Sequence, residues 1–364
     1  MNIDKASKKY QKMPADYAVK PKVAIVVLNW NGGEDTINCL ESVRKLEYPN
    51  FLTVVIDNGS QDGSIEKIKS WIYTCFKRPF MFVEYEQKVA LQGGNRESER
   101  NLHAAPSSKR IVLIRNKTNL GYDGGNNVAI HYALKNPYPA DYVFLLNNDA
   151  EAHKDCLDNL VQVSKDKAKS IVGAVVINKK SQEPEFVKSG SFFKHFFVTL
   201  TTDQDKNEAH GLYWTSSIVS GAAALIENDV LSTIYSLRGQ YLNAGLFAYH
   251  DELDFCFFAS KIGYKAVVAG AAIVYHRNRE RPSSQYRSCL FHYYFTRNAI
   301  LLASSLLPLH LKILFHIFYF PLTMRRALKM IIFQKRIEAR TILAGLFDGY
   351  RGIKGKWKLH DSKV

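Results

Sequence analysis

The chain has 364 residues, a formal net charge of +15 at pH 7 and a pI near 9.4. This length suits one large α/β unit with an extension as well as two domains. The charge indicates a polyanionic partner, which nucleic acid, an anionic membrane face or a phosphorylated substrate would satisfy. Five scattered cysteines, none in a C-x-x-C pair, argue against a disulfide framework or zinc knuckle and fit a reducing cytosol.

Residues 1–21 are charged and contain no apolar stretch of the kind that marks a secretory signal, so we expect a loosely ordered lead-in. Strand and helix patterns then alternate, which predicts an α/β fold with a mostly parallel, doubly wound sheet. Residues 84–110 break this rhythm. They are polar, with Gly-Gly-Asn and Pro-Ser-Ser clusters, and predict an inserted loop or hairpin.

Polar side chains close several of the predicted strands. Asn29 ends the first and Asp57 the second, while Asn147, Asn148 and Asp149 follow a short apolar run in the middle of the chain. The carboxyl ends of parallel strands are where open α/β sheets bind ligands, and oxygen is the ligand atom that Mg²⁺ prefers. The last group therefore predicts a metal and diphosphate site. A strand that ends in a polar turn is the alternative.

A glycine-rich turn at 116–127 precedes a predicted helix at 128–134. Free N–H groups at such a helix start would suit a phosphate or a ribose, although a glycine turn before a helix is more often only a turn.

Three acids, Asp251, Glu252 and Asp254, stand within four positions at a later predicted helix start. Acids there also favour the positive end of the helix dipole, so capping is a serious alternative to catalysis. The predicted strand at 266–275 ends in His276. The arginines Arg277, Arg279 and Arg281 follow it, and they suit an acceptor phosphate or an ordinary solvated loop.

The C-terminal part, 299–364, changes character. Residues 299–324 are strongly apolar, but Pro308 and Pro321 interrupt them, so we expect no membrane span. Spacings of four and three place five polar residues on one helical face, which is typical of a helix that lies in the membrane interface. These residues are Lys312, His316, Tyr319, Thr323 and Arg326. The following tail is rich in Lys and Arg, which anionic lipid attracts. A helical cap with a solvated basic face is the alternative.

Five segments together resemble the family 2 inverting glycosyltransferases over about residues 22–300. They are VAIVVLNWNG, VVIDNGSQDGS, NKTNLGYDGGNN, LLNNDAE, and YHDELDFCFFASKIGY with the downstream His276. The resemblance implies a GT-A fold over 22–298, a nucleotide-diphosphate-sugar donor linked to dTDP, UDP or GDP, and a divalent metal, Mg²⁺ or Mn²⁺. Within the family the chain looks most like rhamnosyltransferase-like members that extend surface polysaccharides and glycolipids.

The resemblance also assigns roles by position. For the nucleoside and donor it implies Asn29, Asp57, Asn119, Gly121, Asn147 and Asn148. For the metal it implies Asp149 in a D-x-D-like motif, completed by His276. The family's acidic pair matches Asp251 and Glu252, and we favour Glu252 as the general base, with Asp251 the alternative because many relatives have the opposite order. Asp254 is assigned to orientation, capping or the acceptor, and Asp57 would equally suit an Asx-turn. Asp123 stands where the family usually has a small residue.

These inferences predict a metal-dependent inverting glycosyltransferase, peripheral on the cytoplasmic face of the cell membrane, that acts on a lipid-linked saccharide. A nucleic-acid-binding protein would show basic residues interleaved with exposed aromatics. Here the basic residues gather beside an apolar helix, so we expect no nucleic acid partner. A weak or inactive scaffold that binds a nucleotide sugar is the third reading, prompted by Asn147 and the altered acidic pair.

Overall fold

The structure is a computed structural model, which describes residues 20–75, 81–186, 213–277 and 285–358. An eleven-stranded sheet runs through the molecule in the order β3-β4-β2-β1-β5-β10-β7-β11-β6, with β8 beside β7 and β9 beside β11. Its first five strands are all parallel to one another, as predicted. They are β3 (Met81–Glu86), β4 (Arg110–Arg115), β2 (Phe51–Asp57), β1 (Val23–Asn29) and β5 (Tyr142–Asn147).

The other half of the sheet is mixed. β10 runs antiparallel to both β5 and β7, whereas β7 and β11 are parallel. These strands are β6 (Ala150–Ala152), β7 (Ser170–Asn178), β8 (Pro184–Phe186), β9 (Tyr213–Ser216), β10 (Ala223–Glu227) and β11 (Lys265–His276). β10 begins only at Ala223, because 218–222 turns over the end of β5.

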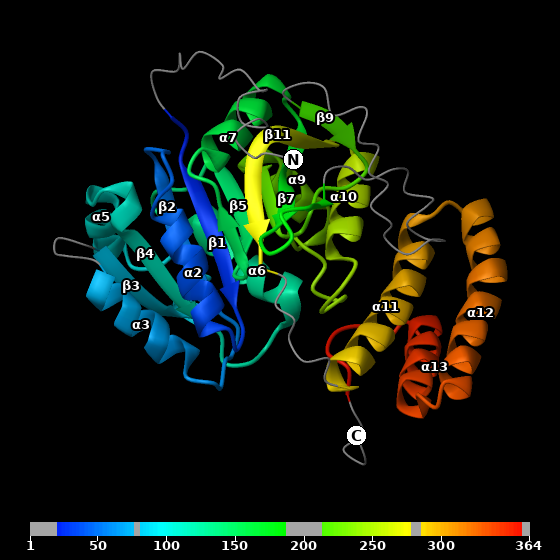
Figure 1. Cartoon of the computed structure of the whole chain (residues 1–364). Helices are drawn as coiled ribbons and strands as arrows, with labels where there is room; N and C mark the ends of the chain where they lie inside the picture. The colour runs from blue at the N-terminus through cyan, green and yellow to red at the C-terminus, as the bar shows by residue number, and fades with distance from the viewer. Residues whose placement is uncertain (1–19, 76–80, 187–212, 278–284, 359–364) are drawn as a thin grey trace.

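Helices cover both faces of the sheet (Figure 1). One buried apolar cluster contains residues of α2 (Gly33–Val43), α3 (Ser64–Cys75) and α7 (Cys156–Asp166). The cluster on the other face contains residues of α6 (Gly121–Lys135), α9 (Asn228–Arg238) and α10 (Asp251–Lys261). Side chains of the central strands enter both clusters, because successive side chains of a strand point to opposite faces of the sheet.

The prediction of a loop or hairpin over 84–110 is wrong. Behind the end of β3, this segment forms α4 (Gln87–Ala90), α5 (Arg96–Ala104) and the 3₁₀ turn η1 (Ser107–Lys109). Asn95 caps α5 by accepting hydrogen bonds from the N–H groups of Glu97 and Ser98. The helix buries few apolar residues, and Glu99 is held inside by the hydroxyls of Tyr85 and Tyr132, so an apolar period was missing from the sequence.

Three C-terminal helices form a bundle beside the sheet: α11 (Gln285–Leu306), α12 (Leu309–Ile332) and α13 (Arg336–Tyr350). The expected boundary between 298 and 299 therefore falls inside α11, which begins the bundle earlier. Pro308 caps α12, as a helix break there predicts, but Pro321 lies within the helix and does not end it. Buried Tyr319 and Thr323 on either side keep this segment packed, which offsets the lost backbone hydrogen bond.

Along α12 the polar stripe faces the protein and the apolar residues face outward. Tyr319 and Thr323 are buried, and His316 contacts the hydroxyl of Tyr350 on α13. The side chains of Leu309, Ile313, Ile317 and Phe318 are 73%, 53%, 58% and 53% exposed. Among the described residues no helix has the length and hydrophobicity to cross a bilayer. In Figure 1, α12 lies on the side of the bundle remote from the sheet.

Candidate active site

Buried polar side chains at the ends of β1 and β2 form a hydrogen-bonded cluster. Asn29 and Asp57 pair in register, and the Asn29 amide donates to the Asp57 carboxylate at 2.8 Å. Thr36 donates to Asn29 at 2.8 Å, and the Ser60 N–H donates to Asp57 at 3.1 Å. Both side chains are almost fully buried. This geometry matches the turn-forming alternative for Asp57, so the pair shapes the loop that would receive a nucleoside.

Asn58 organises the glycine-rich loop, and the sequence analysis missed it. Its amide donates to Asn119 at 3.0 Å and to the Gly121 carbonyl at 2.9 Å, while its oxygen accepts from Asn116 and the Leu120 N–H. Gly121 has φ +79°, and a Cβ there would come within 2.3 Å of the Phe247 carbonyl oxygen. Only glycine fits this approach, which brings the start of α6 against the segment before α10.

β5 ends at Asn147, and the two residues after it lie at the sheet edge. Asn148 donates to Thr36 at 3.1 Å, so it lies beside the hydrogen-bonded cluster around Asn29. Asp149 lies 3.1 Å from His276 Nε2. The other ring nitrogen of His276 lies 2.9 Å from Glu185 of β8. Burial disfavours the imidazolium, but the hydrogen bonds and charges of Asp149 and Glu185 outweigh it and raise the pKa of His276 to about 9.

The described residues contain no group of three or more His, Cys, Asp or Glu side chains arranged to hold a metal ion. Asp149 and His276 nevertheless fit a cation shared with a substrate. Mg²⁺ usually takes one or two carboxylates from the protein and completes its shell with water and phosphate oxygens, so a protein cage is unnecessary. Glu185 supplies the partner that a ligating histidine normally has on its second nitrogen.

The acidic pair stands at the start of α10. His250, the residue before the pair, has a left-handed backbone with φ +68°. Asp251 and Glu252 are partly accessible, and burial raises the pKa of both carboxyls. Asp254 is 2% exposed and pairs with Arg238 at 2.7 Å, which makes it an internal anchor of α10.

Backbone contacts bring this pair to the same edge as Asp149. The N–H of Asn147 donates to the Ala222 carbonyl at 3.0 Å, and the Tyr122 hydroxyl donates to the Gly221 carbonyl at 2.9 Å. Glu252 lies against Gly221. Burial raises the pKa of Tyr122 well above its usual range, and four nearby carboxylates add to this rise: Asp251, Asp123, Glu252 and Asp149.

Of the three arginines that follow β11, the structure describes Arg277. The backbone N–H of Arg277 donates to the Asp149 carbonyl at 2.8 Å, but its guanidinium donates to Glu151. Lys179 also binds Glu151, at 2.6 Å. Arg277 is thus tied to its own strand end, and Arg279 and Arg281 lie outside the described residues, as do 1–19 of the expected lead-in.

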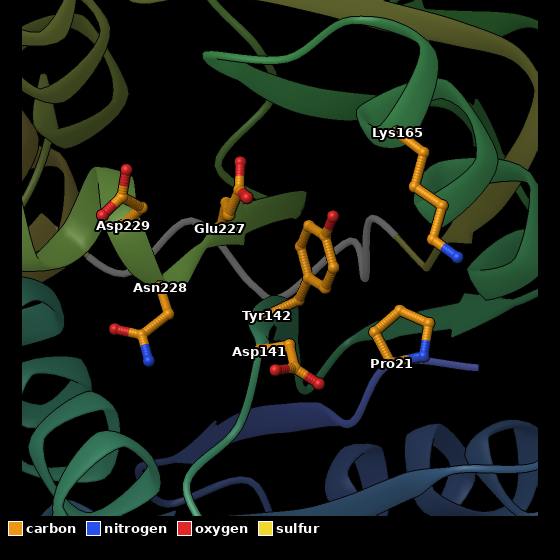
Figure 2. A pocket seen from close by; sticks show the side chains of 7 residues that line it. All are labelled: Pro21, Asp141, Tyr142, Lys165, Glu227, Asn228 and Asp229. Atoms are coloured by element: carbon orange, nitrogen blue, oxygen red, sulfur yellow. The ribbon is translucent and has the colours of Figure 1, made fainter. Parts of the chain in front are cut away.

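A cavity of about 530 Å³ opens at the opposite edge of the sheet, where β5 begins (Figure 2). Asp141 and Tyr142 line it together with Glu227 at the end of β10. The Asp141 carboxylate there already accepts from the Lys22 N–H at 2.7 Å. None of the predicted site residues lines this cavity, and we assign the chemistry to the other strand ends.

Comparisons with known proteins agree with this geometry. Residues 95–235 match the family described as glycosyl transferase family 2. The low-salt glycan biosynthesis hexosyltransferase Agl10 of Haloferax volcanii is 25% identical over 255 residues, which cover 68% of this chain and 76% of the relative. The fold is similar to that of the mannosyltransferase PcManGT of Pyrobaculum calidifontis, solved with GDP-Man and Mn²⁺. The TM-score is 0.51 and the identity 14%, over 95% of this chain and 92% of that one.

The fold is that of the GT-A glycosyltransferases, with polar residues gathered at the carboxyl ends of the strands. Over residues 95–235 the chain is similar to glycosyltransferase family 2, in agreement with the resemblance of its sequence motifs.

Proposed function

We propose that this chain is a metal-assisted inverting glycosyltransferase that moves a sugar from a nucleoside diphosphate to a hydroxyl of a lipid-linked saccharide. The observation that carries the proposal is the convergence of three polar groups at one sheet edge. They are the hydrogen-bonded pair of Asn29 and Asp57, Asp149 with His276, and the acids at the start of α10. Donor, leaving group and base need such proximity for a single displacement.

In this mechanism Glu252 accepts the proton of the acceptor hydroxyl. The oxygen attacks the anomeric carbon from the face opposite the diphosphate, the new C–O bond forms, and the old one breaks with its electrons going to the diphosphate. A base in this position contributes typically about 10²–10⁴-fold. Asp149 and His276 would hold the divalent cation, which supplies positive charge to the leaving diphosphate.

The donor sugar and acceptor are narrower proposals. The mannosyltransferase similar in fold was solved with GDP-Man, and the archaeal relative is named for glycan biosynthesis. For this chain we propose a hexose or deoxyhexose donor, with rhamnose favoured by the sequence resemblance.

The outward apolar face of α12 supports a membrane-bound acceptor. Apolar side chains cover this helix on the side away from the protein, and the exposed Arg325 and Lys329 lie on the same helix. Such a helix binds at the boundary between lipid headgroups and acyl chains, where anionic lipid attracts the basic residues. We propose that the enzyme is peripheral on the cytoplasmic membrane face.

Calorimetry with UDP, dTDP and GDP, with Mn²⁺ and then with chelator, tests the donor site. We expect one nucleotide to bind only with metal, and Asp149→Ala to lose that metal dependence. Glu252→Gln should bind the same nucleotide while transfer is lost. Absence of nucleotide binding under every condition would contradict the proposal. Full transfer by Glu252→Gln would contradict the assignment of Glu252 as the base.

A further inference from the structure

Near the proposed base, one buried carboxyl group has no hydrogen-bond partner in the part of the chain that the structure describes. Asp123 is the third residue of α6 and is 2% exposed. Neither of its carboxyl oxygens has a hydrogen-bond partner among the described residues. An ionised carboxylate in such a place would have lost its hydration with nothing in return, so the group must keep a proton or share one.

Asp123 faces a small cavity that it shares with the acidic pair. Asp251 and Glu252 line the same space, whose volume is about 30 Å³, enough for a water molecule. Asp251 Oδ1 is likewise buried without a partner among the described residues. Orphaned oxygens on two carboxyl groups beside one water-sized space provide an acceptor and a donor for a single proton.

The charges around the cavity are strongly unbalanced. The titratable and charged groups that face Asp123 or the cavity come from three helices: Tyr122 of α6, Arg238 of α9, and Asp251, Glu252, Asp254 and Cys256 of α10. Arg238 is the cation of this set, and it is already paired with Asp254 at 2.7 Å. The positive ends of α6 and α10 favour negative charge only partly. Three further carboxylates cannot all ionise there.

We propose that Asp123 and Asp251 share one proton across this cavity, directly or through a water molecule, so that Glu252 is left as the ionised carboxylate that meets the acceptor. The shared proton is a property of the protein without substrate, and only the role given to Glu252 rests on the proposed function. Burial, then the charge of Asp251, raises the pKa of Asp123, in agreement with a retained proton. Asp123 is therefore a positioning residue that acts through Asp251.

Infrared difference spectroscopy on the full chain near neutral pH detects a protonated carboxyl by its C=O stretch. We expect this band in the wild type, its loss in Asp123→Asn, and a shift in Asp251→Asn, where the proton meets an amide oxygen. Asp229→Asn, an exposed position on α9, is the matched control and should change nothing. Absence of the band in the wild type, or an unshifted band in Asp251→Asn, would overturn the shared proton whether or not the protein transfers sugar.

Transfer rates give a second readout, in which the conservative Asp123→Asn should retain what Asp123→Ala loses. Asparagine at 123 can still donate to Asp251, so kcat of Asp123→Asn should stay within about threefold, whereas Asp123→Ala should lose roughly tenfold, the effect of one hydrogen bond. Asp251→Asn should retain more transfer than Glu252→Gln. Equal losses in Asp123→Asn and Asp123→Ala would contradict the pairing. If Asp123→Asn does not fold, Asp123→Ala takes its place in the infrared comparison.

Discussion

His276 has partners on both ring nitrogens, and the second one, Glu185, comes from a short strand far away in the sequence. If the imidazole ligates a cation through Nε2, Glu185 fixes its tautomer and orientation through Nδ1. Removal of such a partner typically lowers metal affinity about 10–100-fold. Glu185 is therefore predicted to matter for metal binding although it would not touch the metal.

We expect Glu185→Gln to weaken Mn²⁺ binding roughly tenfold, because His276 loses the negatively charged partner on its Nδ1 atom. Manganese titration in the presence of the bound nucleotide measures this. Glu183→Gln, an exposed change two residues away, is the control and should leave the titration unaltered. Identical affinities in both variants would remove His276 from the metal site.

Asp123 also predicts a pH dependence of stability. Its pKa is raised in the folded state, so between the unfolded value, about 3.9, and the folded value the native protein binds more protons than the unfolded chain. The free energy of unfolding therefore falls as the pH rises through that window.

Asp123→Asn removes this pH dependence. We expect the variant to gain stability relative to the wild type as the pH rises from about 4 to neutral, measured by urea unfolding at several pH values. A constant difference between the two proteins at every pH would mean that Asp123 ionises freely in the fold.

At the scale of elements, α11 holds the segment that leads into the acidic pair. Arg297 is fully buried and donates to the carbonyls of Leu246 and Gly355, each at 2.6 Å. Its neighbour Asn298 donates to the carbonyls of Ala248 and Tyr249. The segment needs this support because three of its residues have left-handed backbones, at φ +67°, +64° and +68° for positions 247, 249 and 250.

We expect Arg297→Lys to lower the free energy of unfolding by about 3 kcal/mol, because a point charge cannot reach the carbonyls that the guanidinium fork spans. Transfer should fall as well, while nucleotide binding stays close to that of the wild type. Denaturant unfolding and calorimetry measure the two effects. Arg340→Lys, on the exposed side of α13, is the control. If a destabilised Arg297→Lys variant kept wild-type transfer, the C-terminal bundle would have no part in positioning the base.

The elements that the sequence predicted are those whose apolar pattern is local. The strand predicted before Asn29 and the apolar run before Asn147 became β1 and β5, because strands buried on both faces need continuous apolar residues. α5 could not be predicted this way, since its stability comes from a cap and from Glu99 meeting two distant tyrosines.

The candidate site divides along the same line. The motifs indicated Asp149, His276 and the acidic pair, each by its place after a strand or at a helix start. Glu185, Asn58 and Arg297 act through contacts that exist only after the chain has folded, so no local pattern marked them. The cavity between Asp123 and Asp251 likewise depends on two helix starts meeting in space.

For the whole molecule, the exposed face of α12 predicts membrane binding. We expect the protein to bind vesicles that contain anionic lipid, and the binding to weaken at high salt. Ile313→Glu with Ile317→Glu should reduce partitioning at least tenfold, because two apolar side chains would no longer enter the lipid. Vesicle co-sedimentation measures both effects.

Leu237→Glu is the matched control for this test. Leu237 on α9 is 59% exposed, close to the 58% of Ile317, but it lies outside the C-terminal bundle. Equal binding by the α12 variant and the control would contradict the membrane assignment. A dimer that forms through α12 and persists with vesicles present would identify a second copy of the chain as the partner.

The outward apolar face of α12 has a kinetic consequence. An enzyme fixed to a bilayer by one helix meets its acceptor by diffusion in two dimensions, while its donor arrives from the aqueous phase. The rate should then follow the mole fraction of acceptor in the surface, so diluting that surface with inert lipid slows the reaction at constant bulk concentration.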